Sequence, residues 1–330
     1  MTTAFTTAIT DLVGESPSLE LTNGERFTLE ALVRRLAETA PSLVDDTYWL
    51  MHARLASCCL PFRVLEAIRT FRHDAGVDGM LTISNLPIAP ESLPPTPSVP
   101  DSVEPAATVP AAIAVLLGQQ LGEVIAYRDE KSGALVQNIV PVPALERSQS
   151  NGGSVPLQLH TENAFHPNRP DYVGLLCLRP AREGVGTHVA SIRRALALLD
   201  GGDLAVLQQA RFQTAAPPSF GSADRSGPHP VLNGGADDPD IRVDFHATSA
   251  LDEAAAAALS RLREALMEVR VDLVLRSGDM VFLDNRLVVH GRSAFAPRYD
   301  GGDRWLHRVF VHLDNRRSRP LRAGNGSVLA

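Results

Sequence analysis

The sequence is organised around the stretch Leu157-Gln158-Leu159-His160-Thr161-Glu162. Successive residues of a β-strand point to opposite faces, so Gln158, His160 and Glu162 share one face and the two leucines share the other. An imidazole and a carboxylate two residues apart can therefore reach one metal ion, while the leucines anchor the strand in a core. We predict that His160 and Glu162 are two ligands of a metal site.

A third ligand is offered by Val288-Val289-His290-Gly291, an apolar run that follows the turn signal Asp284-Asn285. Two histidines and one carboxylate leave the remaining positions of an octahedral ion open, which is the arrangement of non-haem Fe(II) oxygenases. A His-x-Glu triplet is expected by chance roughly once in a chain of this composition, so the triplet alone is a weak motif. The metal prediction depends on the rest of the chain.

Length and composition indicate a globular protein with a substantial core. The chain has 330 residues, of which 44% are hydrophobic, and this length allows one large domain or two ordinary ones. Its net charge is −7 and no block of basic residues occurs, so we expect no nucleic-acid partner.

Cysteine usage and hydropathy bear on the cellular compartment. The 3 cysteines, Cys58, Cys59 and Cys177, cannot form an even-numbered disulfide framework, and we interpret them as buried or structural thiols in a reducing compartment. Residues 1–18 lack the pattern of a signal peptide, and no long apolar run occurs. These features predict a cytoplasmic protein without a membrane partner.

The order of periodic segments predicts an α+β fold. Helical spacing over about 25–75 indicates an N-terminal helical layer, and alternation on both sides of Lys131-Ser132-Gly133 within residues 123–142 predicts a hairpin. Residues 213–235 are rich in turn residues and predict a lid or binding loop, with a disordered insertion as the alternative. The polar tail after Asn315 is expected to be frayed.

The second half of the chain reads as short strands separated by glycine, proline and asparagine turns. With ligands on two distant strands, this pattern predicts a double-stranded β-helix, or jelly roll, that encloses the site, although periodicity alone does not exclude another sandwich. We expect one domain over 1–330, with its jelly-roll core over about 123–315. In Arg304 to Val311 the residues alternate, so Arg304 and Arg308 project from one face, roughly 13 Å apart.

The ordered set of His160-Thr161-Glu162, Thr187, His290 and Arg304 resembles the Fe(II)/2-oxoglutarate oxygenases of the clavaminate synthase-like group over about residues 123–315. That group includes asparagine oxygenase and arginine β-hydroxylase. The resemblance implies that His160, Glu162 and His290 hold Fe(II), and that Thr187 and Arg304 hold the distal carboxylate of 2-oxoglutarate. O2 would be the second cosubstrate. A planar guanidinium suits this role because it binds a carboxylate bidentately.

The resemblance also implies a substrate site. Arg308 would take the α-carboxylate of an amino acid, Gln137 and Asn151 would contact its amino acid end, and Asp244 would lie near its side chain or ammonium. From the residues alone, a glutamine such as Gln137 in an apolar strand more often faces an edge or solvent.

We therefore predict a hydroxylase of a free L-amino acid that acts at Cβ on a polar or basic substrate of the arginine, lysine or asparagine type. Desaturation, cyclisation and C4 hydroxylation on the same apparatus remain open, because no motif records the fate of the substrate radical. Halogenation is disfavoured because Glu162 occupies the position that a halide would need. A non-catalytic jelly roll that senses a metal or small ligand is the alternative from another class.

Overall fold

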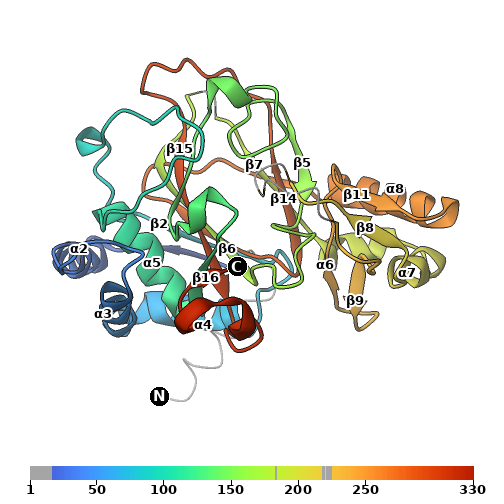
Figure 1. The fold of residues 1–330 in the computed structure, drawn as a ribbon, viewed down its shortest axis with the longest axis horizontal. Helices are drawn as coiled ribbons and strands as arrows, with labels where there is room; N and C mark the ends of the chain where they lie inside the picture. Colours follow the sequence, from blue (N-terminus) through green and yellow to red (C-terminus); the bar gives the residue numbers. More distant parts are fainter. Residues whose placement is uncertain (1–16, 183, 218–219, 221–224) are drawn as a thin grey trace.

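The computed structural model describes residues 17–182, 184–217, 220 and 225–330. The N-terminal prediction over 1–18 therefore lies almost entirely outside the described residues, as do residues 218–219 and 221–224 of the predicted lid. Within these ranges the chain mixes helices with two main β-sheets (Figure 1). In the described part of the chain, no helix is long and apolar enough to cross a membrane.

The large sheet runs through the centre of the molecule. Its strand order is β1 (Ser18–Glu20), β2 (Met80–Ser84), β13 (Met280–Asp284), β6 (Tyr172–Arg179), β15 (Trp305–His312), β3 (Glu123–Tyr127) and β16 (Val328–Leu329), with β4 (Gln137–Ile139) also paired to β15. The central strands β13 and β15 are buried along their whole length. Strands covered on both faces read as nearly continuous apolar runs, which explains the composition of β6 and β13.

The small sheet has the order β12 (Val271–Leu273), β7 (Thr187–Ser191), β14 (Val288–Arg292) and β5 (Leu157–His160). All three of its pairings are antiparallel, and the register of β14 against β5 shifts between His290 and Arg292. Residues of both sheets line one cavity, so the sheets enclose it between them.

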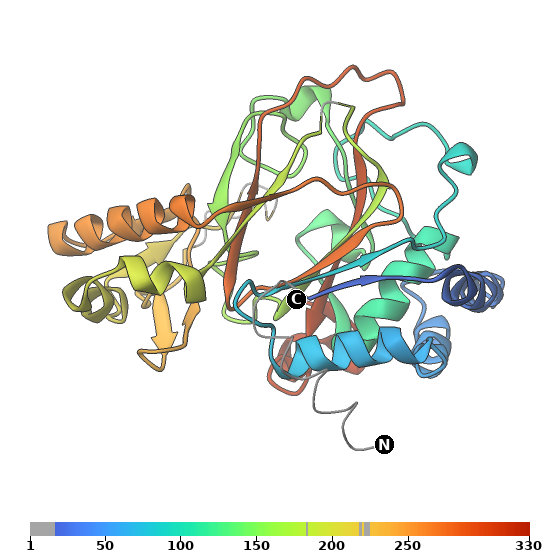
Figure 2. The same cartoon turned by 180° about the vertical axis from the view of Figure 1, so that it is seen from behind.

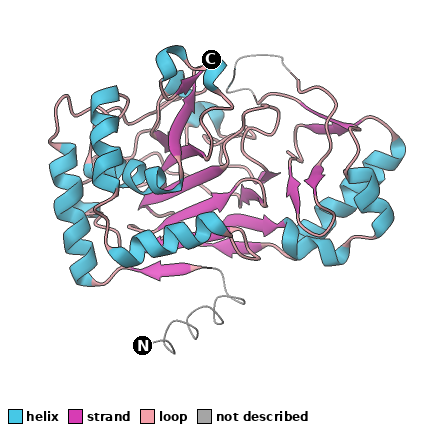
Figure 3. Ribbon diagram, turned by 90° about the horizontal axis from the view of Figure 1, so that it is seen from below, coloured by secondary structure: helices cyan, strands magenta, loops and turns pink. Residues whose placement is uncertain are grey.

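Helices cover the outer face of the large sheet. They are α2 (Asn23–Ala37), α3 (Thr47–Ser57), α4 (Phe62–His73) and α5 (Val109–Leu121), with α5 between β15 and the other three. Thr108 is the N-cap of α5. The residues of α5 are buried on nearly all sides of the helix because α5 lies between the sheet and the other helices. In α2, Leu29, Leu32, Val33 and Leu36 are buried, as expected for the helical layer predicted over about 25–75. Figure 3 shows helices beside the strands of the large sheet.

A smaller group of elements lies at the opposite end of the molecule (Figure 2). It contains helices α6 (Ile192–Ala195), α7 (Gly201–Leu207) and α8 (Glu253–Glu268), and two short pairs, β8 (Phe212–Thr214) with β11 (Thr248–Ala250) and β9 (Leu232–Gly234) with β10 (Pro239–Ile241). The described residues also form short 3-10 helices: Pro90–Ser92, Lys131–Gly133, Pro143–Leu145, Leu196–Leu198, Arg319–Leu321 and Ala323–Asn325.

Several expectations from the sequence are wrong. The strands on either side of Lys131–Gly133 do not form a hairpin, because β3 and β4 pair with successive parts of β15 instead of with each other. The tail is not frayed, because β16 pairs in parallel with β3. Strands β8 and β9 form the two ends of the segment 213–235, which does not test the prediction of a lid or binding loop. Cys58 and Cys59 are exposed, and Cys177 alone is buried.

Candidate metal centre and substrate cavity

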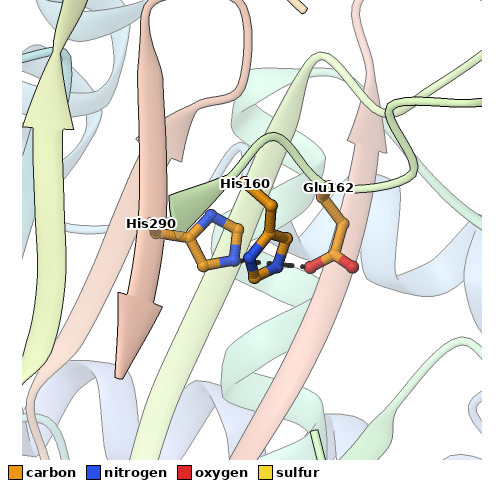
Figure 4. Close-up of side chains that lie close together, drawn as sticks. All are labelled: His160, Glu162 and His290. Atoms are coloured by element: carbon orange, nitrogen blue, oxygen red, sulfur yellow. Dashed lines mark ion pairs between the residues drawn. The ribbon is translucent and has the colours of Figure 1, made fainter. Parts of the chain in front are cut away.

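Three predicted ligands meet between the two sheets. His160 ends β5, Glu162 follows two residues later, and His290 lies directly across from His160 in the pairing of β14 with β5. One ligand atom from each residue lies within 4.8 Å of the others, and Nε2 of His290 is 3.6 Å from Oε2 of Glu162 (Figure 4). Among the described residues, this is the one group of three His, Cys, Asp or Glu side chains close enough to share an ion.

Hydrogen bonds from neighbouring groups orient the ligands. Nδ1 of His160 lies 2.8 Å from the carbonyl oxygen of Gln158, which leaves Nε2 of His160 for a metal. Asn285 fixes the backbone of Glu162, because Oδ1 of Asn285 accepts from its N–H at 2.7 Å and Nδ2 donates to its carbonyl at 3.1 Å. The second residue of the turn signal therefore holds the carboxylate ligand in place.

The electrostatics of the centre favour the protonation states that bind a metal. Burial would raise the pKa of Glu162, but Arg308, His290 and His160 outweigh it and hold that pKa well below its usual value. Burial lowers the pKa of His290, and repulsion from His160 lowers it further. An ionised carboxylate and a neutral imidazole are the ligand forms of these groups. With two imidazoles and one carboxylate, the donor set fits Fe(II).

The cavity beside this centre has a volume of about 500 Å³. Its wall includes the three ligands and most of the other residues that the sequence singles out: Thr187, Arg304, Arg308, Asn151 and Asp244. Gln137 is not part of the wall. The size of the cavity suits a small organic molecule bound next to a metal.

Arg304 and Thr187 lie together on the cavity wall. Nη2 of Arg304 donates to Oγ1 of Thr187 at 3.4 Å, and the guanidinium makes no ion pair with any described residue. Burial lowers the pKa of Arg304 to about 10, so it remains a cation at neutral pH. A buried cation without an acidic partner is costly, and a bound anion would compensate its charge.

Arg308 links the metal ligand to a second buried carboxylate. Its Nη1 donates to Oε1 of Glu162 at 3.0 Å, and its Nη2 donates to Oε1 of Glu130. Oε1 of Gln137 accepts from Nε of Arg308 at 3.0 Å and also from Nη2. Burial raises the pKa of Glu130, and the nearby Arg308 offsets part of that rise. The result is a buried row of Glu130, Arg308 and Glu162 that ends at the metal centre.

The structure places the remaining predicted residues in different settings. Gln137 is 1% exposed, so it faces neither an edge nor solvent, and it holds the Arg308 guanidinium. Asn151 lies on the cavity wall. Oδ1 of Asp244 accepts the N–H groups of His246 and Ala247 in a local turn, whereas its Oδ2 makes no hydrogen bond to the described residues.

The sequence analysis did not single out three charged residues of the cavity wall: Glu130, Arg292 and Arg225, the last within the predicted loop over 213–235. Glu130 precedes a turn in which Lys131 and Ser132 have positive φ, a conformation that these residue types do not signal. Arg292 lies two residues after His290 on the same strand. Residues two apart on a strand point to the same face, so Arg292 could have been predicted to share the inner face with His290. Gln158 lies on the cavity wall, and its Oε1 is buried without a hydrogen-bond partner among the described residues. Leu157, predicted for the opposite face, also lines the cavity, because the register of β5 against β14 is irregular.

Comparisons with known proteins agree with this geometry. The family model described as taurine catabolism dioxygenase TauD, TfdA family matches residues 111–310. The chain is 44% identical over 303 residues to an L-asparagine oxygenase from Streptomyces coelicolor, with 91% of each chain covered. It is 35% identical over 323 residues to an L-lysine 3-hydroxylase from Catenulispora acidiphila, with 96% of this chain and 89% of that relative covered.

A solved structure gives the same result for the fold. The crystal structure of asparagine oxygenase in complex with Fe(II), (2S,3S)-3-hydroxyasparagine and succinate matches with a TM-score of 0.93 and 43% sequence identity. The match covers 94% of this chain and 98% of that one.

Proposed function

Because the chain belongs to the TauD, TfdA family of dioxygenases, we propose that it hydroxylates the Cβ carbon of free L-asparagine or of an amino acid with a similar amide side chain. The reaction uses Fe(II), 2-oxoglutarate and O2. The observation that carries the proposal is the buried row of Glu130, Arg308 and Glu162, which offers a site for a zwitterion directly beside the metal ligands.

His160, Glu162 and His290 would hold Fe(II), and Arg304 with Thr187 would hold the distal carboxylate of 2-oxoglutarate. When bound, the metal supplies the oxidative decarboxylation of 2-oxoglutarate to succinate and the oxygenation of an unactivated C–H bond. The protein contributes placement, because a reactive carbon must be held within a few tenths of an ångström of a productive position.

The α-groups of the substrate fit the charges of the buried row. Arg308 would bind the α-carboxylate, and Glu130 would accept the α-ammonium. Oε2 of Glu130 accepts only one hydrogen bond from the described residues, from Nδ2 of Asn163 at 3.2 Å, so it retains lone-pair capacity for a further donor. Anchoring both α-groups beside Glu162 would bring Cβ, the first side-chain carbon, towards the metal.

The groups that would meet the side chain match an amide. Among the described residues, no donor reaches Oδ2 of Asp244 or the buried Oε1 of Gln158, and a primary amide supplies two N–H groups. Asn151 can donate to the amide oxygen from its Nδ2. A buried acceptor left without a donor is costly, so a substrate with an apolar side chain would bind poorly.

The charge of the cavity favours an amide over an ammonium or a guanidinium. Its wall carries four arginines against three carboxylates: Arg225, Arg292, Arg304 and Arg308 against Glu130, Glu162 and Asp244. Fe(II) and 2-oxoglutarate have opposite charges of equal size, so they do not reverse this balance. A cationic side chain would add to an excess of positive charge, whereas a neutral amide would not.

We also propose that the two sheets form a double-stranded β-helix and that residues 1–330 are one oxygenase domain. The support is that one continuous hydrophobic cluster joins residues of the helical layer, both sheets and the smaller group of elements. The predicted lid over 213–235 stays a proposal, supported by Thr214, Pro217 and Arg225 on the cavity wall.

The test is incubation with Fe(II), 2-oxoglutarate and each free amino acid separately, with mass spectrometry of the products. We expect a gain of one oxygen with asparagine and much slower turnover of lysine, arginine and leucine. Loss of two hydrogens would indicate desaturation or cyclisation, and no succinate with any amino acid would indicate a sensor. Faster turnover of lysine or arginine than of asparagine would refute the amide assignment.

A variant separates the two substrate classes. Asp244→Asn removes a charge but keeps an acceptor oxygen, so it should slow asparagine only moderately. If the true substrate were cationic, the same change would remove its ion-pair partner and abolish turnover.

A further inference from the structure

Arg292 is a buried cation to which neither the metal centre nor the substrate site gives a role. It is 4% exposed and lies on the cavity wall. Its guanidinium forms no ion pair with a described carboxylate, and its Nε–H is buried without a hydrogen-bond partner. A buried cation without an acidic partner destabilises the fold. The presence of Arg292 at this position therefore suggests that it binds a ligand or positions another group.

The position of Arg292 relates it to Thr187 and Arg304. Arg292 lies directly across from Thr187 in the pairing of β14 with β7. Side chains of directly paired residues lie on one face of a sheet, with Cβ atoms about 4.5–5.5 Å apart. Thr187 in turn accepts from Arg304. Two buried cations and one hydroxyl therefore lie near one another on the cavity wall, beside the residues that would hold the distal carboxylate of 2-oxoglutarate.

The Arg292 guanidinium also donates hydrogen bonds to the loop 151–155. Nη2 of Arg292 donates to the carbonyl of Gly153 at 2.6 Å and to that of Val155 at 3.3 Å, and Nη1 donates to the carbonyl of Asn151 at 3.4 Å. The backbone N–H of Phe295, whose ring packs on the guanidinium, donates to the carbonyl of Ser154 at 3.0 Å. This segment, 151–155, presents Asn151 to the cavity and leads into β5 with its ligand His160.

We propose that Arg292 is a positioning residue that couples the cosubstrate site to the substrate loop 151–155. Without an anion, Arg292 and Arg304 repel each other, and this repulsion weakens the hydrogen bonds from Arg292 to the loop carbonyls. A distal carboxylate bound between them relieves that repulsion, fixes the guanidinium, and orders the loop that carries Asn151. The cosubstrate thereby raises the affinity for the amino acid, and by linkage the amino acid raises the affinity for the cosubstrate.

The proposal rests on the proposed function for the identity of the two ligands, so its first test does not use the amino acid. Hydrogen exchange of peptides covering 148–156 is measured in the Fe(II) protein without O2, with and without 2-oxoglutarate. In the wild type, 2-oxoglutarate should slow exchange in this loop. In Arg292→Lys and Arg292→Gln it should not, even though Arg304 and Thr187 are intact. Arg316→Gln, an exposed change, is the matched control and should behave like the wild type.

The second test measures coupling by calorimetry of L-asparagine binding, again without O2. In the wild type, saturating 2-oxoglutarate should tighten asparagine binding by about fivefold or more, which is the usual range for coupled sites. In both Arg292 variants the factor should fall towards one.

A merely structural role for Arg292 would weaken asparagine binding equally with and without 2-oxoglutarate and leave the coupling factor unchanged, which would overturn the proposal. So would wild-type exchange in 148–156 that does not respond to 2-oxoglutarate. If asparagine does not bind the wild type at all, the proposed substrate is wrong, and the exchange test still decides the role of Arg292.

Discussion

Glu130→Gln tests the substrate site most sharply because it removes one charge and almost no volume. The glutamine can still accept from Arg308 through its carbonyl oxygen, and Arg308 keeps its hydrogen bond to Glu162 at 3.0 Å. The new amide nitrogen, however, faces Nδ2 of Asn163, which donates to Glu130 in the wild type. We expect a loss of about 1 kcal/mol in the free energy of unfolding from that hydrogen bond.

The loss in substrate binding should be larger. Removing the charged partner of a buried α-ammonium costs about 2–5 kcal/mol. Since 1.4 kcal/mol is tenfold in affinity, the dissociation constant for L-asparagine should rise by about thirtyfold or more. Calorimetry on the Fe(II) protein with 2-oxoglutarate and without O2 measures this directly. Glu123→Gln, at a half-buried carboxylate paired with Arg54 outside the cavity, is the matched control and should bind like the wild type.

A ligand without the α-amino group separates binding from positioning. Succinamic acid, which is asparagine lacking its ammonium, should bind the wild type weakly and bind Glu130→Gln with nearly the same affinity. If succinamic acid loses as much affinity as asparagine does, Glu130 acts only by holding Arg308, and its assignment to the ammonium is refuted.

Three further predictions address the metal, the cosubstrate and acid stability. His290→Ala should leave the purified protein without stoichiometric iron by elemental analysis, and wild-type iron content would show that the third ligand is misassigned. Arg304→Ala should weaken 2-oxoglutarate binding by about 2–5 kcal/mol in calorimetry, and an unchanged affinity would remove its role as the anchor. Burial lowers the pKa of His307 to about 3, whereas an unfolded histidine has a pKa of about 6.5. Between these two pH values His307 is protonated in the unfolded state only, so a fall in pH destabilises the folded state. Between pH 7 and pH 5 the free energy of unfolding, measured with urea, should fall by about 2 kcal/mol less in His307→Leu than in the wild type. Equal losses in the two proteins would contradict this.

The proximity of His160, Glu162 and His290 could be predicted in part from sequence, because the relation between the first two is local. His160 and Glu162 share a face by strand alternation, and His290 ends an apolar run after a turn signal, which favours a buried strand. The resemblance predicts that Gln137 contacts the substrate, and in the structure its amide oxygen accepts a hydrogen bond from Arg308. Its assignment to the substrate remains a prediction.

The missed features depend on long-range pairing. Glu130 enters the site because a turn with positive φ at Lys131 and Ser132 aims it at Arg308, 178 residues away in the sequence. The hairpin prediction failed for a related reason: alternation in β3 and β4 shows that both are strands but does not show that both pair with β15. The period of the apolar residues predicts which face of a strand a residue occupies, whereas the tertiary fold determines which strands pair.

L-asparagine that carries deuterium at both Cβ positions tests whether this cavity holds asparagine for oxygenation at Cβ. After turnover with Fe(II), 2-oxoglutarate and O2, we expect a product that has gained one oxygen and lost one deuterium, formed in equal amount with succinate. A hydroxylated product that retains both deuterium atoms, or succinate formed without any hydroxylated product, would contradict it.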